Sequence, residues 1–231
     1  MSNERKTQGV YFALTAFIFW GVAPIYFKWI DHVSPGEILA HRVVWALVLL
    51  ICILMYTGDL KELKVPLGTL PKLFLTAMLL SVNWLVFIYA VVNQNITEAS
   101  LGYFINPLVS VLLAVVFLKE RLRPIQWIAI AIAGTGIAIQ LILFGRTPWL
   151  ALALAFSFGF YGLFRKNLGL HAVAGLAIET MIVAPFALAY ILWMACKQTL
   201  VFGNDIEIDL LLMLAGFITS FPLLCFAAAV T

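Results

Sequence analysis

Residues 126–144 read QWIAIAIAGTGIAIQLILF, a run with no charged side chain and only three polar ones. A helix of about 20 apolar residues is what crosses a hydrocarbon core of about 30 Å. Comparable runs occupy most of the remaining chain, near 10–30, 37–56, 72–92, 99–118, 148–165, 174–195 and 210–230. The sequence therefore predicts an all-α membrane protein that crosses the bilayer about eight times.

The composition also points to the bilayer as the solvent of this chain. Of its 231 residues, 64% are hydrophobic and 11% are charged, whereas soluble domains have about 45–50% apolar and about 25% charged residues. A water-soluble chain this apolar could not cover its surface with polar atoms. The first run stays apolar from about Val10 to Ile30, roughly twice the core of a cleaved signal peptide, so we expect it to remain as the first span.

Cofactor and metal motifs are not found in the sequence. Cys52, Cys196 and Cys225 lie in or beside apolar runs without metal-type spacing, so neither a zinc site nor a disulfide framework is expected. The Gly-Thr-Gly at 134–136 is not a phosphate loop, because no strand precedes it and no Lys-Ser/Thr follows. No basic cluster is interleaved with aromatic residues, so we expect no nucleic-acid partner.

The distribution of lysine and arginine orients the predicted spans. One side of the membrane receives ten of the 14 basic residues, namely Arg5, Lys6, Lys61, Lys64, Lys72, Lys119, Arg121, Arg123, Arg165 and Lys166. The opposite side receives only Lys28, Arg42, Arg146 and Lys197. Because cytoplasmic loops carry the excess of basic residues, the N-terminus is predicted to be cytoplasmic. The Lys119–Arg121 segment is interpreted as topological rather than catalytic.

A weak internal repeat connects the two ends of the chain. A shift of 138 residues places Gly21 on Gly159 and the His41-Arg42 pair on Glu179-Thr180. The shift also places residues 81–84 on residues 219–222. Five spans separate the two starts, an odd number, so the second copy would be inverted, as in many secondary transporters.

The repeat defines two predicted parts of the chain. Residues 1–147 would form a first repeat of five helices, and residues 148–231 would form the first three helices of a second. The fourth and fifth helices of that copy would fall near 237–282, beyond Thr231. We therefore expect an inverted repeat whose second copy is incomplete.

Four segments resemble the RarD proteins, which form part of the EamA branch of the drug/metabolite transporter superfamily. Residues 20–28 (WGVAPIYFK) and 37–45 (EILAHRVVW) are similar to the opening of these proteins. Residues 98–107 (EASLGYFINP) and 117–122 (FLKERL) resemble the signature of their fourth span. The resemblance covers essentially the whole chain. It implies ten helices in two inverted five-helix repeats, a bacterial inner (plasma) membrane location and transport of a small-molecule substrate.

The candidate substrate-pathway residues begin with the ionisable side chains inside spans. Arg42 lies in a motif of the family, and His41 beside it is about 100° around the helix, so both cannot face one cavity equally. An imidazole ordinarily titrates near neutral pH, which makes His41 a candidate proton carrier. Glu179 is the carboxylate deepest in a span and a functional candidate for that reason. For Lys28 and Arg42 the alternative is snorkelling to head groups, and for Glu179 it is a structural ion pair.

Further candidates are polar or aromatic. Asn83 and Trp84 offer an amide and an aromatic surface near the middle of the third span, although Asn83 could equally bond two helices. Asn106 precedes Pro107, where we expect a break that frees backbone carbonyls. Aromatic and ring side chains expected to shape the pocket are Trp20, Pro24, Tyr103 and Tyr161.

The sequence therefore predicts an integral membrane transporter that exports or exchanges a small metabolite or drug-like molecule by alternating access, with proton coupling as the expected drive. An enzyme is not expected, because no catalytic constellation of histidines and carboxylates is present. The alternative is a non-transporting, truncated membrane protein or an assembly component. The bilayer is the expected surrounding, and a homodimer is left open.

Overall fold

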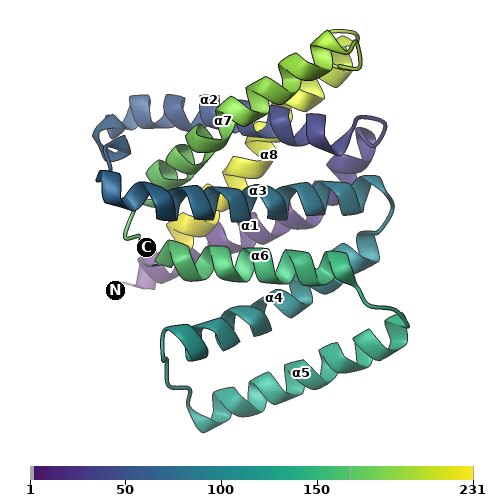
Figure 1. Cartoon of the computed structure of the whole chain (residues 1–231). Coiled ribbons are helices and arrows are strands. Elements are labelled where there is room, and N and C mark those ends of the chain that lie inside the picture. The colour runs from purple at the N-terminus through teal and green to yellow at the C-terminus, as the bar shows by residue number, and fades with distance from the viewer. Residues whose placement is uncertain (1–2, 167, 231) are drawn as a thin grey trace. The chain divides into compact units, whose positions relative to one another are not determined.

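The computed structural model describes residues 3–166 and 168–230. Within these ranges the chain forms α1 (Asn3–Trp29), α2 (Pro35–Thr57), α3 (Leu70–Val92), α4 (Ile96–Phe117), α5 (Pro124–Phe144), α6 (Trp149–Lys166), α7 (Ala172–Cys196) and α8 (Ile206–Val230), as Figure 1 shows. Two short 3-10 turns, η1 (Leu60–Leu63) and η2 (Leu67–Thr69), connect α2 to α3. All of these helices except α6 are long and apolar enough to span a membrane. The expected all-α membrane fold is confirmed.

Local chemistry sets the ends of these helices, and α2 is the clearest case. The Ser34 side chain accepts a hydrogen bond from the Glu37 N–H at 3.3 Å, and Pro35 occupies the first helical position. At the other end Gly58 adopts a left-handed conformation with φ 78°, which closes the last turn. The helix is therefore two residues longer at its start and one at its end than the apolar run that predicted it.

The chain divides into two compact units, which are described separately. Unit 1 comprises residues up to Ala77 and from Leu170 onward, and it contains α1, α2, α7 and α8. Unit 2 comprises Met78–Gly169, with most of α3 together with α4, α5 and α6. Each unit thus takes helices from both predicted sequence repeats.

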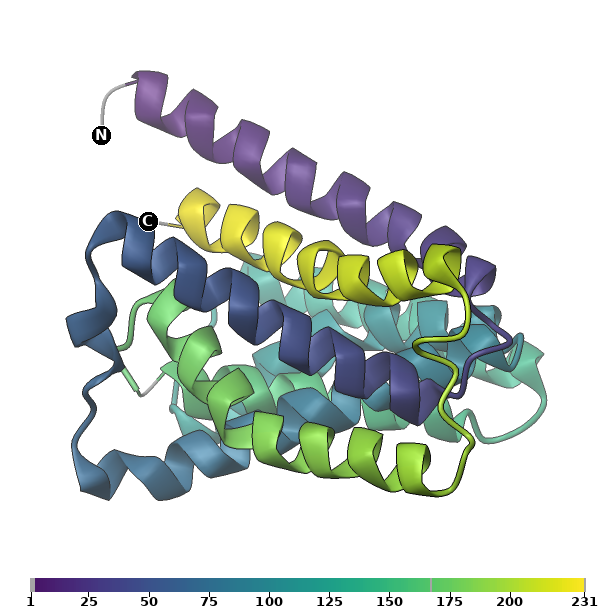
Figure 2. The ribbon, with the colours of Figure 1, turned by 90° about the horizontal axis from the view of Figure 1, so that it is seen from above.

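In unit 1, α2 packs against both α7 and α8, and α8 also packs against α1. Figure 2 shows α2 and α8 beginning at the same end, where α7 finishes. The closest approach of α2 and α8 is at Gly216, where an added Cβ would lie 2.4 Å from the Trp45 carbonyl carbon. The Tyr26 hydroxyl donates to the Leu211 carbonyl oxygen at 2.6 Å, which joins α1 to α8. Only glycine permits this α2–α8 crossing.

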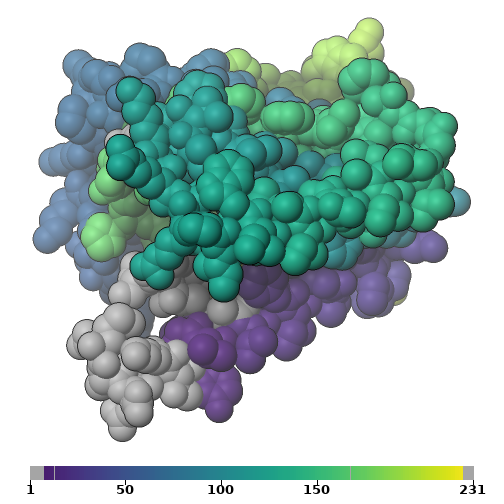
Figure 3. All heavy atoms as spheres, turned by 90° about the horizontal axis from the view of Figure 1, so that it is seen from below, coloured from purple at the N-terminus to yellow at the C-terminus, as the bar shows by residue number. Residues whose placement is uncertain are grey.

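In unit 2, α4 lies between α5 and α6 and packs closely against α6 (Figure 1). The shared core is apolar and consists of Leu101, Ile105, Val109, Leu113, Ala151, Ala155 and Leu163. Helix α5 contacts α4 but buries none of its own residues, and Figure 3 shows it open along its length. The helix α4 continues through Pro107, so the expected break at that residue is wrong.

Candidate functional site

The α2 helix of unit 1 carries a buried polar stripe at intervals of four residues. Glu37 is fully buried, and His41 is 4% exposed. Trp45 follows one turn later and buries its indole nitrogen. Residues four apart lie on one face of a helix, so the three side chains form a column along α2. We call Glu37, His41 and Trp45 the α2 stripe.

Glu37 connects the beginning of α2 to the loop between α7 and α8. Its Oε1 atom accepts hydrogen bonds from the backbone N–H groups of Val201 and Phe202, at 2.9 and 3.0 Å. A buried carboxylate needs such donors, because its charge is costly to desolvate without them. Sequence analysis missed this role, since the loop that supplies the donors lies more than 160 residues away along the chain.

His41 lies one turn further along the α2 stripe and faces the same loop. Its ring stacks on the ring of Phe202, with centroids 4.4 Å apart and planes inclined by 28°. Neither His41 ring nitrogen has a hydrogen-bond partner within the described part of the chain, and the same holds for Trp45 Nε1. Buried polar atoms of this kind ordinarily have a partner. The His41 ring and the Trp45 indole therefore keep hydrogen-bonding capacity that no described residue uses.

Arg42 faces a different neighbour, as its position about 100° from His41 requires. It is 7% exposed, and its guanidinium carbon lies 5.8 Å from the centroid of the Phe27 ring on α1. This is cation–π distance. The structure thus places His41 toward the α7–α8 loop and Arg42 toward α1.

Glu179 and Thr180 are buried on α7, which packs against α2. Glu179 is seven residues past the first residue of α7, and Arg42 is seven residues past that of α2. At 1.5 Å per residue, each lies about 10 Å inside its own helix. Because α2 and α7 run in opposite directions (Figure 2), the two ionisable levels lie at similar depths from opposite ends of unit 1.

The remaining candidates of unit 1 all belong to α1. Trp20 is half-buried and makes an edge-to-face contact with Phe17, with ring centroids 5.6 Å apart. Pro24 is half-buried inside the helix. Lys28 is exposed in the last turn, which suits the snorkelling alternative.

In unit 2, one of the buried residues that sequence analysis selected is Asn83. Asn83 on α3 donates from Nδ2 to the Leu154 carbonyl oxygen and to Ser157 Oγ, both at 3.0 Å. Both acceptors belong to α6, so the Asn83 amide joins two helices. Its neighbour Trp84 is buried as well.

The other predicted residues of unit 2 are more open. Tyr103 is half exposed and packs edge-to-face on Phe87 at 5.7 Å. Tyr161 is half-buried. Asn106 is also half-buried, and its Oδ1 accepts a hydrogen bond from the Ser110 hydroxyl at 3.3 Å. The predicted site residues are thus divided between the two units.

Glu98 is a second buried carboxylate that sequence analysis did not select as a site residue. It lies in the first turn of α4, where its Oε1 accepts from the Leu150 N–H at 2.8 Å and its Oε2 lies 3.4 Å from Arg146 Nη2. Glu98 thereby holds the beginning of α6. The signal that could have found Glu37 and Glu98 is an acidic residue in the first turn of a span, on the side of the membrane that is predicted to receive few basic residues.

The chain is similar to several known proteins. A family model described as "EamA-like transporter family" matches residues 7–142. Protein RarD of Salmonella typhimurium is 46% identical over 235 residues, which cover 100% of this chain and 80% of that protein. Protein RarD of Escherichia coli (strain K12) is 45% identical, with 100% and 79% covered. The "Chloramphenicol-sensitive protein RarD" of Pseudomonas aeruginosa is 31% identical, with 92% and 73% covered.

Proposed function

The chain belongs to the EamA-like transporter family and to its RarD group, and we propose that it exports or exchanges a small metabolite or drug-like molecule by alternating access. Family membership makes it a bacterial multi-pass membrane transporter rather than an enzyme. The proposal adds the direction, the mechanism, the drive and the residues of the pathway. It also adds location in the inner membrane with a cytoplasmic N-terminus, as the distribution of basic residues predicts.

The observation that carries the proposal is the set of ionisable side chains buried in the membrane helices of unit 1. Arg42, His41 and Glu179 are at most 7% exposed. An ionisable group at the centre of a membrane helix is expensive and is retained where it serves a pathway. Their two levels, each about 10 Å inside its helix and counted from opposite ends of unit 1, suit a pathway that opens to one side at a time.

Contacts that follow the predicted inverted repeat support alternating access. In unit 1, the ring centroids of Phe19 on α1 and Phe221 on α8 are 4.8 Å apart. In unit 2, Asn83 on α3 bonds to Ser157 on α6. The shift of 138 residues relates position 19 to position 157 and position 83 to position 221. The 19–221 contact in unit 1 is therefore equivalent to the 157–83 contact in unit 2. In transporters built from inverted repeats, one repeat or bundle moves against the other around the binding site as access alternates.

Proton coupling is the proposed drive, carried by His41 and Glu179. The shift of 138 residues relates these two positions, so each repeat would contribute one titratable group. The other acidic groups near His41 are Glu37 on its own helix and Asp209 in the first turn of α8. The rings of Phe202 and Phe27 lie beside His41 and Arg42, so a pathway past this pair would present both polar groups and aromatic surface to a substrate. We therefore propose a substrate that presents both a polar group and an aromatic or apolar surface.

The test is transport by the full chain in proteoliposomes that enclose a pH-sensitive dye, with a panel of amphipathic metabolites and antibiotics added outside. We expect at least one compound to drive proton movement that depends on protein. Glu179→Gln should abolish this signal, whereas Glu62→Gln, which alters a carboxylate outside the spans, should leave it intact. Transport that is unchanged and independent of pH in Glu179→Gln would refute the proton role. A chain that folds and moves none of the panel would favour the non-transporting alternative.

A further inference from the structure

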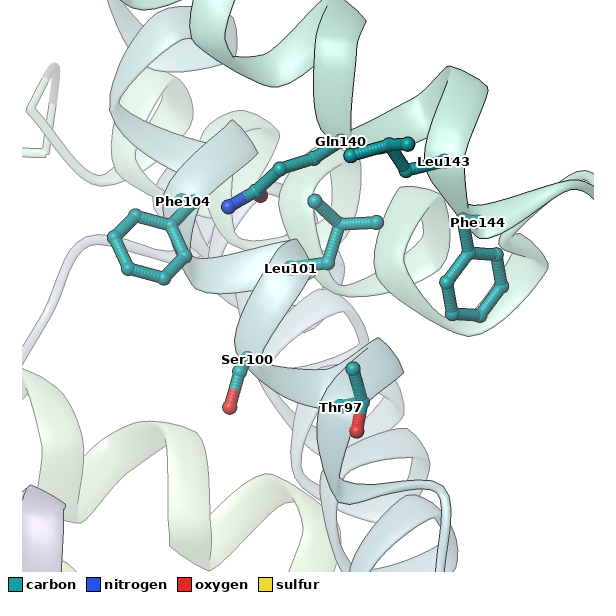
Figure 4. Close-up of a pocket in the computed structure, with 7 residues that line it drawn as sticks. All are labelled: Thr97, Ser100, Leu101, Phe104, Gln140, Leu143 and Phe144. Carbon is teal, nitrogen blue, oxygen red and sulfur yellow. The ribbon is translucent and has the colours of Figure 1, made fainter.

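A cavity of about 360 Å³ lies between α4 and α5 in unit 2 (Figure 4). Its lining residues are Thr97, Ser100, Leu101, Phe104, Gln140, Leu143 and Phe144. In Figure 4, Leu101 and Leu143 lie between the rings of Phe104 and Phe144. The cavity is largely apolar, and it occupies the end of the unit where α4 begins and α5 finishes.

A cation lies at this end of the cavity. Arg146 follows α5 by two residues, and its guanidinium carbon is 5.3 Å from the centroid of the Phe144 ring, which lines the cavity. The Arg146 side chain is 66% exposed. Trp149, at the start of α6, is also exposed. Exposed tryptophan and arginine at helix ends are typical of the head-group level of a bilayer.

We propose that this cavity binds one acyl chain of a phospholipid whose phosphate contacts Arg146. The order of the chemistry matches a lipid: a cation at head-group level, with an apolar slot directly beneath it. Because surrounding lipid tails are as apolar as the slot, the acyl chain alone gives little preference for this site. The preference therefore comes from the charge-assisted contact between guanidinium and phosphate.

Glu98 does not prevent this contact. One of its carboxylate oxygens accepts from the Leu150 N–H, and the other lies 3.4 Å from Arg146 Nη2. A guanidinium has five N–H donors, so Arg146 can contact Glu98 with one edge and a phosphate with another. Glu98 in this arrangement fixes the position of Arg146 above the slot.

The α5 helix explains why a lipid should occupy the cavity. None of its residues is buried, and α4 is its packing partner in unit 2. An acyl chain in the slot would fill the space between the two helices and increase the contact of α5 with its unit. The lipid is thus expected to stabilise the position of α5.

The experiment uses the full chain in nanodiscs that contain phosphatidylglycerol with a photoactivatable acyl chain. We expect crosslinks to concentrate in peptides that contain residues 97–104 and 140–144. Arg146→Gln should lower this labelling about fivefold, which corresponds to about 1 kcal/mol. A diacylglycerol probe with the same photoactivatable chain but no phosphate should label the wild type and Arg146→Gln equally.

A second variant fills the slot itself. Ser100 lines the cavity and is exposed, so Ser100→Trp adds an indole there and should lower labelling of these peptides by the phosphatidylglycerol probe to the level of the diacylglycerol probe. Ile128→Trp, at the opposite end of α5 and also exposed, is the matched control and should change nothing. Uniform labelling around α5, or no response to Arg146→Gln, would overturn the proposal. Crosslinks between copies through this slot, with lipid excluded, would assign it to a second copy instead. If Ser100→Trp does not fold, labelling of the wild type and of Arg146→Gln by the two probes is sufficient to test the proposal.

Discussion

Unit 1 and unit 2 are both built from apolar membrane helices, yet they bury different kinds of polar side chain. Both units bury a carboxylate in the first turn of a helix, Glu37 in unit 1 and Glu98 in unit 2. Deeper in the helices, unit 1 buries His41, Arg42 and Glu179, whereas unit 2 buries an amide and a hydroxyl, Asn83 and Ser157, that bond to one another. A neutral pair that satisfies itself holds two helices together at little cost. Buried ionisable groups are costly in the same setting. This difference supports the proposal that the transport pathway lies in unit 1, whereas the Asn83 amide of unit 2 joins two helices.

The two units also differ in the glycines at their helix crossings, and substitution of one of these glycines gives the largest expected loss of stability. We predict that Gly216→Ala destabilises unit 1 by about 3 kcal/mol or more, because the added methyl group meets backbone atoms that cannot move aside. These atoms are the Trp45 carbonyl carbon at 2.4 Å and the Ala46 nitrogen at 2.5 Å. Thermal denaturation followed by size-exclusion chromatography in detergent measures the loss.

Substitutions at two other glycines serve as comparisons for Gly216→Ala. In unit 2, Gly102→Ala would bring a methyl group to 3.0 Å from the Ala151 carbonyl oxygen, so its effect should be smaller. Gly21→Ala on α1 has no atom within 4 Å of the new methyl group and should be neutral or slightly stabilising. A Gly216→Ala protein as stable as Gly102→Ala would contradict the close α2–α8 crossing.

The second-largest expected loss of stability comes from removing one of the two buried carboxylates at helix starts. Glu37 accepts two backbone N–H groups of the α7–α8 loop, whereas Glu98 accepts one backbone N–H of α6. Each buried donor left without a partner costs about 1–3 kcal/mol. We therefore predict that Glu37→Ala destabilises more than Glu98→Ala, measured by the same thermal assay.

Hydrogen exchange provides the local readout for these two variants. Exchange at Val201 and Phe202 should rise in Glu37→Ala alone, and exchange at Leu150 should rise in Glu98→Ala alone. Equal exchange at all three amides in both variants would show that the carboxylates do not hold these loops.

The sequence predicted the helices well because the bilayer imposes one length on every span. The run at 72–92 became α3 at Leu70–Val92, and the run at 126–144 became α5 at Pro124–Phe144. The largest difference is at α1, which begins at Asn3 rather than near residue 10. Polar residues can continue a helix outside the membrane, and a search for apolar runs of spanning length does not detect them.

The site was less predictable, because burial inside a membrane protein depends on which helices meet. Sequence analysis selected Arg42 and Glu179 from their depth in spans, and both are buried. It did not select Glu37 or Trp45, since their contacts with the α7–α8 loop and with α8 join segments over 160 residues apart. Periodicity finds the face of a helix but not the segment that covers it.

Asn83 gives a direct test of the difference between the units. Asn83→Leu removes the two hydrogen bonds to α6 and should cost about 1 kcal/mol, the usual size of interhelical bonds in membranes. Transport should continue in the protein that remains folded, in contrast to Glu179→Gln. Transport rates per folded molecule in proteoliposomes separate the two outcomes. Loss of transport in Asn83→Leu at normal stability would place the pathway in unit 2 as well.

The smallest expected effect concerns surface ion pairs. In unit 2, Lys166 Nζ lies 2.6 Å from Glu120 Oε1, and both side chains are about half exposed or more. In unit 1 the corresponding contact is longer, 4.0 Å between His171 Nε2 and Glu62 Oε1. Exposed pairs contribute about 0–1 kcal/mol and weaken with salt. We therefore predict that Lys166→Gln lowers the stability of unit 2 by less than about 1 kcal/mol, and that high salt removes the difference.

This last variant also tests whether the summed basic charge or the Lys166–Glu120 pair sets the topology around α6. Lys166 and Arg165 end the short helix α6 on the side that is predicted to be cytoplasmic, so removing one of its ten basic residues leaves the excess of basic charge largely intact. Reporter fusions after α6 should therefore keep their orientation in Lys166→Gln. An inverted orientation in Lys166→Gln would instead mean that the Lys166–Glu120 pair, rather than the summed basic charge, fixes this side of unit 2.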